Sequence, residues 1–136
     1  MMTTWQVSRR TGATLRQLQW WDEQGVVFPI AREGHERLWD LADVNRVLFV
    51  VQLRRRGISL QRVRRMLKRH AVDLLGTETW AILDPAGRIV AFTSDCEVLL
   101  RHLEDDSRRL QAIRINRVTQ AEVDGAAQGF RRRVAA

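Results

Sequence analysis

Apolar residues in the first half of the chain recur at helical spacing and are interrupted by short polar or glycine-containing breaks. A period of about 3.6 residues predicts amphipathic helices, and the breaks mark their ends. The predicted helices lie at residues 5–10, 14–25, 40–56 and 59–69. The clearest core stripe belongs to the third helix, at Val44, Val47, Leu48 and Val51. The first half is therefore predicted to be mainly helical.

The first two helices are predicted to form a helix-turn-helix. Gly12 suits a helix end, and Thr14 is followed three residues later by Gln17, which is the pattern of a capping box. Only residues 11–13 separate the two helices, and this is the spacing of a helix-turn-helix. The segment VVFPIAREGHERLW, residues 26–39, contains a proline and a glycine between short apolar runs. It is predicted to be a small β-hairpin, or wing.

The second half changes to a strand pattern. Residues 80–83 and 88–92 are rich in β-formers and flank the turn Asp-Pro-Ala-Gly at 84–87, which predicts a hairpin. Residues 94–97, Ser-Asp-Cys-Glu, match a capping box with Ser94 as the cap and open a helix. Residues 110–118 supply a third strand, so the predicted order is ββαβ.

These elements predict an α+β protein with two small domains. The first, at residues 1–75, is a winged helix-turn-helix of four helices plus the wing hairpin. The second, at residues 76–120, is the small ββαβ module, for which we expect self-association or binding of a partner or effector. Residues 121–136 are predicted to be a flexible tail.

Two adjacent tryptophans, Trp20 and Trp21, stand in the second helix, where neighbours point about 100° apart. On a helical wheel Leu15, Leu18 and Trp21 share one side and are predicted to be core. Trp20 falls on the opposite side beside Arg16 and is predicted to be exposed. An indole N–H can donate to a phosphate oxygen, and helix N-termini attract phosphate. Trp20 is therefore a candidate phosphate contact, although packing under the wing or on another domain also accounts for it.

The excess positive charge lies entirely in the first half of the chain. The formal net charge is +7; residues 1–70 hold 14 basic and 6 acidic residues, and residues 71–136 hold 9 and 10. A basic half beside a neutral one favours a module that binds a polyanion such as nucleic acid. The sequence has no apolar run of membrane-spanning length and no signal-peptide pattern, so we expect no membrane association and a cytoplasmic location.

Candidate chemistry beyond nucleic-acid binding is sparse. The lone Cys96 excludes an internal disulfide and a thiolate metal cluster, and it is predicted to be a small buried residue. His35 has no partner His or Cys at ligand spacing, so no metal site is expected. Paired carboxylates, a Gly-rich phosphate loop and a Ser/His/Asp set are all missing, which predicts neither an enzyme nor a cofactor. The strands also lack the aromatic pattern of single-stranded RNA binders.

Three segments of the first half follow one another in an informative order: VSRRTGATLRQLQWWDEQGVV, AREGHERLWDLADV and LRRRGISLQRVRRML. They resemble the Thr-Leu-Arg-Tyr-Tyr-Glu-like helix, the Gly-x-Arg-x-Tyr wing and the Leu-Arg-x-x-Gly-Phe-Ser-Leu segment of the MerR family of bacterial transcription regulators. The resemblance covers about residues 1–70, half of the chain. It implies a winged helix-turn-helix whose second helix enters the major groove of DNA.

The resemblance also implies which residues contact DNA. Carried over by position, these are Thr14, Arg16, Gln17, Gln19, Trp20, Arg37, Arg55, Arg56 and Ser59. Position and charge alone add Arg32 and His35. The family commonly has an arginine where this chain has Gln19, so this chain lacks one cation at that place. The wing also carries one extra residue before its arginine, which leaves the register of His35 open.

The leading hypothesis is a sequence-specific double-stranded DNA-binding transcription regulator. The resemblance implies a homodimer that distorts promoter DNA for RNA polymerase. The family usually dimerises through a long helix after the fourth one, but here Gly76 and the β pattern arrive too early for it. That departure favours the alternative, an excisionase-like or antitoxin-like DNA-binding accessory protein.

Overall fold

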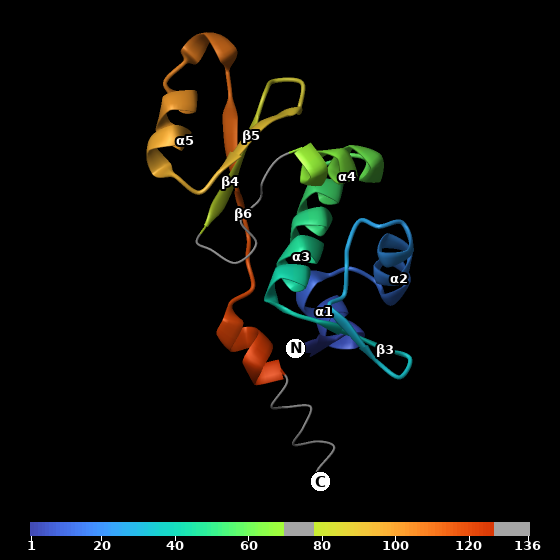
Figure 1. Cartoon of the computed structure of the whole chain (residues 1–136). Coiled ribbons are helices and arrows are strands. Elements are labelled where there is room, and N and C mark those ends of the chain that lie inside the picture. The colour runs from blue at the N-terminus through green and yellow to red at the C-terminus, as the bar shows by residue number, and fades with distance from the viewer. Residues whose placement is uncertain (70–77, 127–136) are drawn as a thin grey trace. The chain divides into compact units, whose positions relative to one another are not determined.

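The computed structural model describes residues 1–69 and 78–126, which form two compact units (Figure 1). The first unit contains Met1–Ile58 together with the described residues from Arg117 onward, and the second contains Ser59–Asn116. The chain thus leaves the first unit after Ile58 and returns to it at Arg117. The units do not divide at the expected boundary between residues 75 and 76, because helical periodicity shows that a helix exists but not which unit it joins.

Helices α1 (Thr4–Thr11) and α2 (Leu15–Glu23) are the two helices of the helix-turn-helix. Each starts with a reciprocal capping box between a threonine and the glutamine three residues later, which satisfies two of the free amides at the helix start. Helix α1 ends at Gly12, whose φ of 85° lies in the left-handed region that glycine adopts at little cost. The predicted capping box at Thr14 and the stop at Gly12 are confirmed.

The wing is the hairpin of β2 (Ala31–Glu33) and β3 (Glu36–Trp39). A two-residue strand β1 (Met2–Thr3), which the sequence analysis does not predict, pairs with β3, so the antiparallel sheet has the order β1-β3-β2. Trp39 is fully buried and its Nε1 donates to Thr4 Oγ1 at 3.0 Å. The pairing and this bond attach the wing to the start of α1.

Helix α3 (Leu41–Arg55) is the most buried helix of the first unit. Asp40 caps it, and Asp43 completes the box by accepting from the Asp40 amide at 3.3 Å. Its buried residues include the predicted stripe and its neighbours: Val44, Asn45, Val47, Leu48, Phe49, Val50, Val51 and Leu53. A helix that is apolar on most of its circumference is a core helix, and α3 is the centre on which the first unit packs.

Residues 120–126 are helical and belong to the first unit, although the sequence pattern predicts a flexible tail from residue 121. The side-chain amide of Asn45 in α3 accepts from Val118 N at 2.7 Å and donates to Val118 O at 3.3 Å. Val118 and Val123 are buried. The tail prediction is wrong for residues 121–126, because two valines make no visible stripe and the residue that bonds to Val118 lies 73 positions away.

The second unit contains α4 (Leu60–Arg69), β4 (Thr79–Leu83), β5 (Ile89–Thr93), α5 (Cys96–Leu103), the short 3₁₀ turn η1 (Asp106–Arg108) and β6 (Gln111–Ile115). Its antiparallel sheet has the order β5-β4-β6, and α5 contacts all three strands. The strands and helix after α4 thus follow one another as β, β, α, β along the chain.

Two local expectations for α5 are wrong. Asp95, not Ser94, caps the helix by accepting from Glu97 N at 2.9 Å. The Ser94 hydroxyl lies 3.2 Å from Thr79 Oγ1 of β4, a cross-strand partner that the local motif cannot reveal. Cys96 is exposed rather than buried, and it is the first residue of α5, at the open end of the helix. In the described part of the chain, no helix combines the length and apolarity that a membrane crossing requires.

Candidate nucleic-acid interface

Helix α2 buries one side and exposes the other. Leu18 and Trp21 are 0% and 4% exposed, whereas Trp20 is 53% exposed, so the predicted split of the tryptophan pair is confirmed. Leu15, predicted to be core, is 50% exposed. The buried side of α2 is centred between Leu18 and Trp21. Leu15, the first residue of the helix, points about 90° away from that direction. The helical wheel correctly predicts which side of α2 is buried, but the buried side is narrower than predicted.

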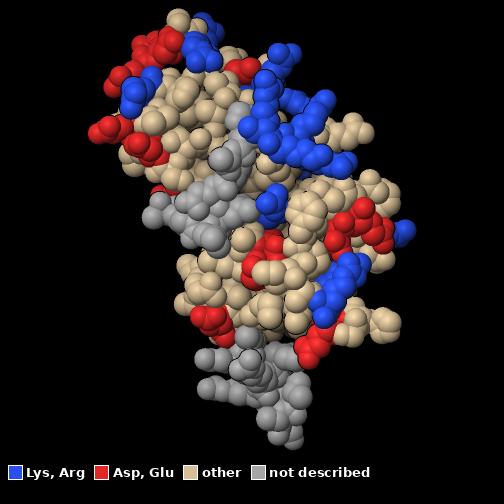
Figure 2. All heavy atoms as spheres, viewed as in Figure 1, with Lys and Arg blue, Asp and Glu red and all other residues tan. Residues whose placement is uncertain are grey.

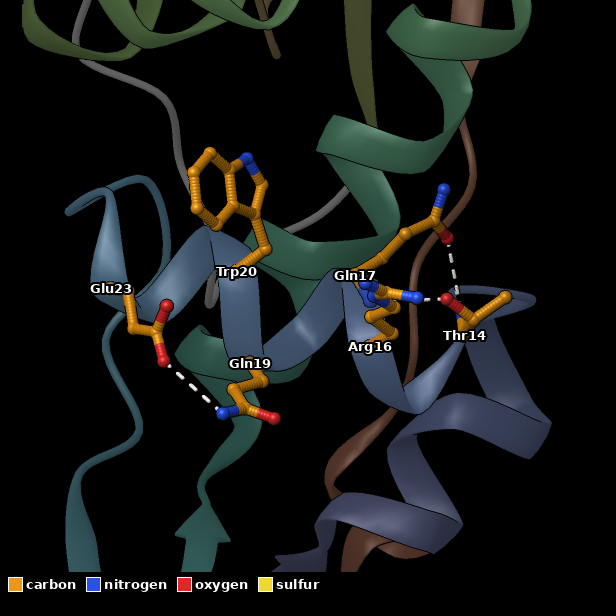
Figure 3. Close-up of a pocket in the computed structure, with 6 residues that line it drawn as sticks. All are labelled: Thr14, Arg16, Gln17, Gln19, Trp20 and Glu23. Atoms are coloured by element: carbon orange, nitrogen blue, oxygen red, sulfur yellow. Dashed lines mark hydrogen bonds between the residues drawn. The ribbon is translucent and has the colours of Figure 1, made fainter.

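Six side chains line an open depression of about 650 Å³ along the helix, and together they are the exposed face of α2: Thr14, Arg16, Gln17, Gln19, Trp20 and Glu23 (Figure 3). Trp20 and Gln19 leave the helix on opposite sides (Figure 3). Thr14 and Gln17 bond to each other in the capping box, at 2.9 and 3.0 Å. The Gln17 oxygen is therefore engaged in the cap, which leaves its amide nitrogen for an external contact.

Gln19 is oriented by the residue one turn later. Its Nε2 donates to Glu23 Oε1 at 3.2 Å (Figure 3). Because a carboxylate only accepts, this bond places the amide nitrogen of Gln19 toward Glu23 and leaves its oxygen on the other side. Arg16 is the single cation among the six residues of the exposed face of α2. This face is therefore suited to reading hydrogen-bond patterns more than to neutralising charge.

Asp22 joins the wing to α2. Its Oδ2 accepts from Arg37 Nε at 2.7 Å and from Arg32 Nη2 at 3.0 Å, and the Asp22 side chain is only 13% exposed. Each arginine uses one of its five N–H donors here, so both keep donors for a ligand. His35 lies exposed at the wing turn. The role of Asp22 is missing from the sequence prediction, which treats Arg32 and Arg37 only as DNA contacts.

Arg55, at the end of α3, reaches the turn of the helix-turn-helix. A Cβ added at Gly12 would lie 2.5 Å from Arg55 Nη2, so the guanidinium of Arg55 lies directly beside this turn glycine, whose positive φ favours glycine. Arg55 and Arg56 are both exposed. The structure thus brings one predicted contact, Arg55, beside the turn that precedes α2.

A second group of cations lies on α4. Five side chains form the basic face of α4: Arg62, Arg64, Arg65, Lys68 and Arg69. All but Arg62 are exposed, and Figure 2 shows basic side chains gathered over this helix. Among the residues that the structure describes, no ion pair joins these five to a carboxylate. The sequence prediction includes Ser59, whose hydroxyl accepts from Arg62 N at 3.3 Å at the start of this helix, but omits the five cations.

The predicted contacts therefore fall into groups. The exposed face of α2 holds Thr14, Arg16, Gln17, Gln19 and Trp20; the wing holds Arg32, His35 and Arg37; the end of α3 holds Arg55 and Arg56. Ser59 belongs to the second unit. Within residues 1–69 and 78–126, no three His, Cys, Asp or Glu side chains lie close enough together to hold a metal ion.

A helix-turn-helix whose second helix presents a polar face next to a β wing defines a DNA-binding protein of the helix-turn-helix class. A family model described as MerR HTH family regulatory protein matches residues 2–70, half of the chain. The chain therefore belongs to the MerR family of helix-turn-helix regulators and is a DNA-binding regulator. No curated protein matches the sequence.

Proposed function

We propose that this protein is a sequence-specific transcription regulator that places α2 in the major groove of double-stranded DNA. The observation that carries the proposal is the exposed face of α2, which lies within the segment that the family model matches. An α-helix with its side chains is about 10–12 Å across, so α2 fits the roughly 12 Å width of the groove. Its polar side chains then meet base edges, while its first amides face the backbone.

Phosphate contacts in this proposal come from three groups of side chains. Trp20 stands at the edge of the exposed face, where its indole N–H can donate to a phosphate oxygen. The ion pairs of Asp22 with Arg32 and Arg37 hold the wing beside α2, so that these two arginines and His35 meet the same duplex. The basic face of α4 adds cations that lack carboxylate partners among the described residues.

The proposed regulator acts as a homodimer that meets RNA polymerase at a promoter. Helix-turn-helix dimers bind half-sites one helical turn apart, so a palindromic site would match this state. The second unit supplies the self-association: strands β5 and β6 are the edges of its sheet, and an edge strand can pair with another chain. Sedimentation of the full chain as a monomer, both free and on DNA, would overturn the dimer.

Substitution of Trp20 tests the placement of α2. The probe is a duplex selected from a random pool by the wild-type protein, and affinity is read by fluorescence anisotropy. Trp20→Ala should weaken binding about 5-fold, the value of one net hydrogen bond, and leave the melting temperature unchanged because the indole is half exposed.

Two controls accompany this test. Leu100→Ala removes an equally exposed side chain from α5 and should keep wild-type affinity. Trp21→Ala should instead cost about 3–5 kcal/mol of unfolding free energy, as truncations of buried tryptophan do. A Trp20→Ala variant that binds as tightly as wild type would show that this side of α2 does not face DNA.

The path of the chain after α4 favours a second candidate, an excisionase-like or antitoxin-like accessory protein. Strand β4 starts at Thr79, ten residues after Arg69 of α4, in the part of the chain where the family usually has a long dimerisation helix. Footprinting on genomic DNA separates the two candidates. Protection of palindromes at promoters supports the regulator, whereas protection confined to a phage attachment site or a toxin operon supports the accessory protein.

A further inference from the structure

A small hollow adjoins the exposed face of α2 on the side of the wing. It has a volume of about 300 Å³ and is lined by Thr4, Trp5, Leu15, Gln19, His35, Glu36 and Arg37. Its apolar wall consists of Trp5 and Leu15, which are 49% and 50% exposed. Two large apolar side chains exposed next to a DNA-binding helix are not explained by the packing of the first unit. A ligand with an apolar group would cover these two exposed side chains.

Leu15 and Gln19 stand one turn apart on the same flank of α2, since residues at i and i+4 share a helix face. Trp20, which the proposed function assigns to phosphate, leaves the helix on the side opposite to Gln19 (Figure 3). The flank with Leu15 and Gln19 is therefore the one that combines an apolar side chain with an amide. Glu23 fixes which end of that amide is the donor.

Trp5 is held in position from its own helix. The guanidinium carbon of Arg9 lies 4.9 Å from the centre of the indole ring, within the range of a cation–π contact. A side chain that is anchored in this way keeps the hollow open without a ligand. Arg37, the cation in the lining, is engaged by Asp22 at 2.7 Å. The remaining donors of Arg37 are assigned to phosphate in the proposed function, so we do not place guanine, which arginine or lysine reads best, at this hollow.

One base pair carries both of the features that this flank fits. The major-groove edge of an A·T pair presents the 5-methyl group of thymine on one base and the N7 acceptor and N6 donor of adenine on the other. Apolar side chains contact the methyl group, and a glutamine amide pairs bidentately with adenine. The second N–H of the Gln19 amide stays available for N7 while the first stays on Glu23.

We propose that Leu15 reads the methyl group of a thymine, that Trp5 closes the hollow around it, and that Gln19 reads the adenine of the same base pair. The inference rests on the proposed function, because it needs α2 in the major groove. It makes Leu15 and Gln19 specificity-determining residues. It also gives Gln19, where the family commonly has an arginine, a role of its own in this chain.

Chemically altered duplexes test the inference without disturbing the protein. In the duplex selected from a random pool, each thymine is replaced in turn by deoxyuridine, which removes only the methyl group, and each adenine by 7-deazaadenine, which removes N7. For wild type, one thymine per half-site should show a loss of about 4-fold, the value of one buried methyl group. The adenine paired with it should show a loss of about 5-fold, the value of one hydrogen bond.

The variants assign each loss to its side chain. Leu15→Ala should bind the thymine and uracil duplexes equally, and Gln19→Ala should bind the adenine and 7-deazaadenine duplexes equally, whereas Leu100→Ala should keep both losses. Wild-type protein that tolerates uracil at every position overturns the inference, and so does a uracil effect that persists in Leu15→Ala. A selection that recovers no preferred duplex overturns the proposed function and this inference with it.

Discussion

Replacing Asp22 with alanine should release the wing from α2. The carboxylate accepts two charge-assisted hydrogen bonds, from Arg37 at 2.7 Å and from Arg32 at 3.0 Å. The Arg37 side chain is 21% exposed, so its bond contributes the usual 1.5–3 kcal/mol or so of a bond to a charged group. The Arg32 side chain is 58% exposed, which limits its share to below about 1 kcal/mol. Asp22→Ala should therefore cost about 2 kcal/mol locally.

Hydrogen exchange at the wing amides, residues 31–39, measures this cost directly, since a loss of about 2 kcal/mol raises the exchange rate roughly 30-fold. Affinity for the selected duplex should fall as well, because binding must then order the hairpin. Removing the negative charge of Asp22 also lessens repulsion of phosphate, and that effect alone would raise affinity. A variant that binds more tightly would therefore refute the idea that Asp22 orders the wing for binding. Glu78→Ala, which breaks the exposed 3.2 Å pair with Arg114, is the matched control and should change neither quantity.

Three further predictions concern the two units. Asn45→Ala should cost about 2–4 kcal/mol in urea unfolding, since it removes two hydrogen bonds and leaves the buried Val118 amide without its acceptor. Burial, and then the Asp40 side chain, raises the pKa of Asp43 to about 7, so the stability that its proton supplies is complete below about pH 4 and lost as the pH rises through 7. Asp43→Asn should therefore match wild type at pH 4 and exceed it at pH 8, by about 1 kcal/mol after allowance for solvent screening. Replacing Arg64, Arg65, Lys68 and Arg69 with glutamine should flatten the log–log salt dependence of DNA affinity by up to about 0.9 per lost phosphate contact; an unchanged slope would remove α4 from the interface.

Local signals were sufficient for the helix-turn-helix. Capping boxes join residues three positions apart, so Thr14 and Gln17 identify the start of α2 without any knowledge of the rest of the chain. The direction of Trp20 and Trp21 also follows from helix geometry alone. Leu15 was misplaced because the wheel cannot show where packing stops at a helix end.

The features that were missed depend on contacts between distant residues. Asp22 meets arginines 10 and 15 positions later, and Asn45 meets Val118 at a separation of 73. No periodic pattern encodes a single carboxylate between two guanidinium groups or an amide that pairs with one peptide unit. Contacts of this kind, from Asn45 to Val118 and from Arg10 to Glu122, hold the returning chain on the first unit, so the flexible tail was the natural but incorrect expectation.

In the proposed function, the cations without carboxylate partners contribute affinity, whereas the base contacts of α2 contribute specificity. On the wing, Arg32 and Arg37 share Asp22, and Arg10 pairs with Glu122 at 3.3 Å, so part of the positive charge of the first unit is already neutralised. The basic face of α4 keeps its charge, because no carboxylate pairs with it among the described residues. Phosphate contacts carry no sequence information, and base contacts do. Loss of α4 cations should then weaken binding to every duplex alike, whereas changes at Leu15 or Gln19 should alter the ratio between the selected duplex and an unrelated one.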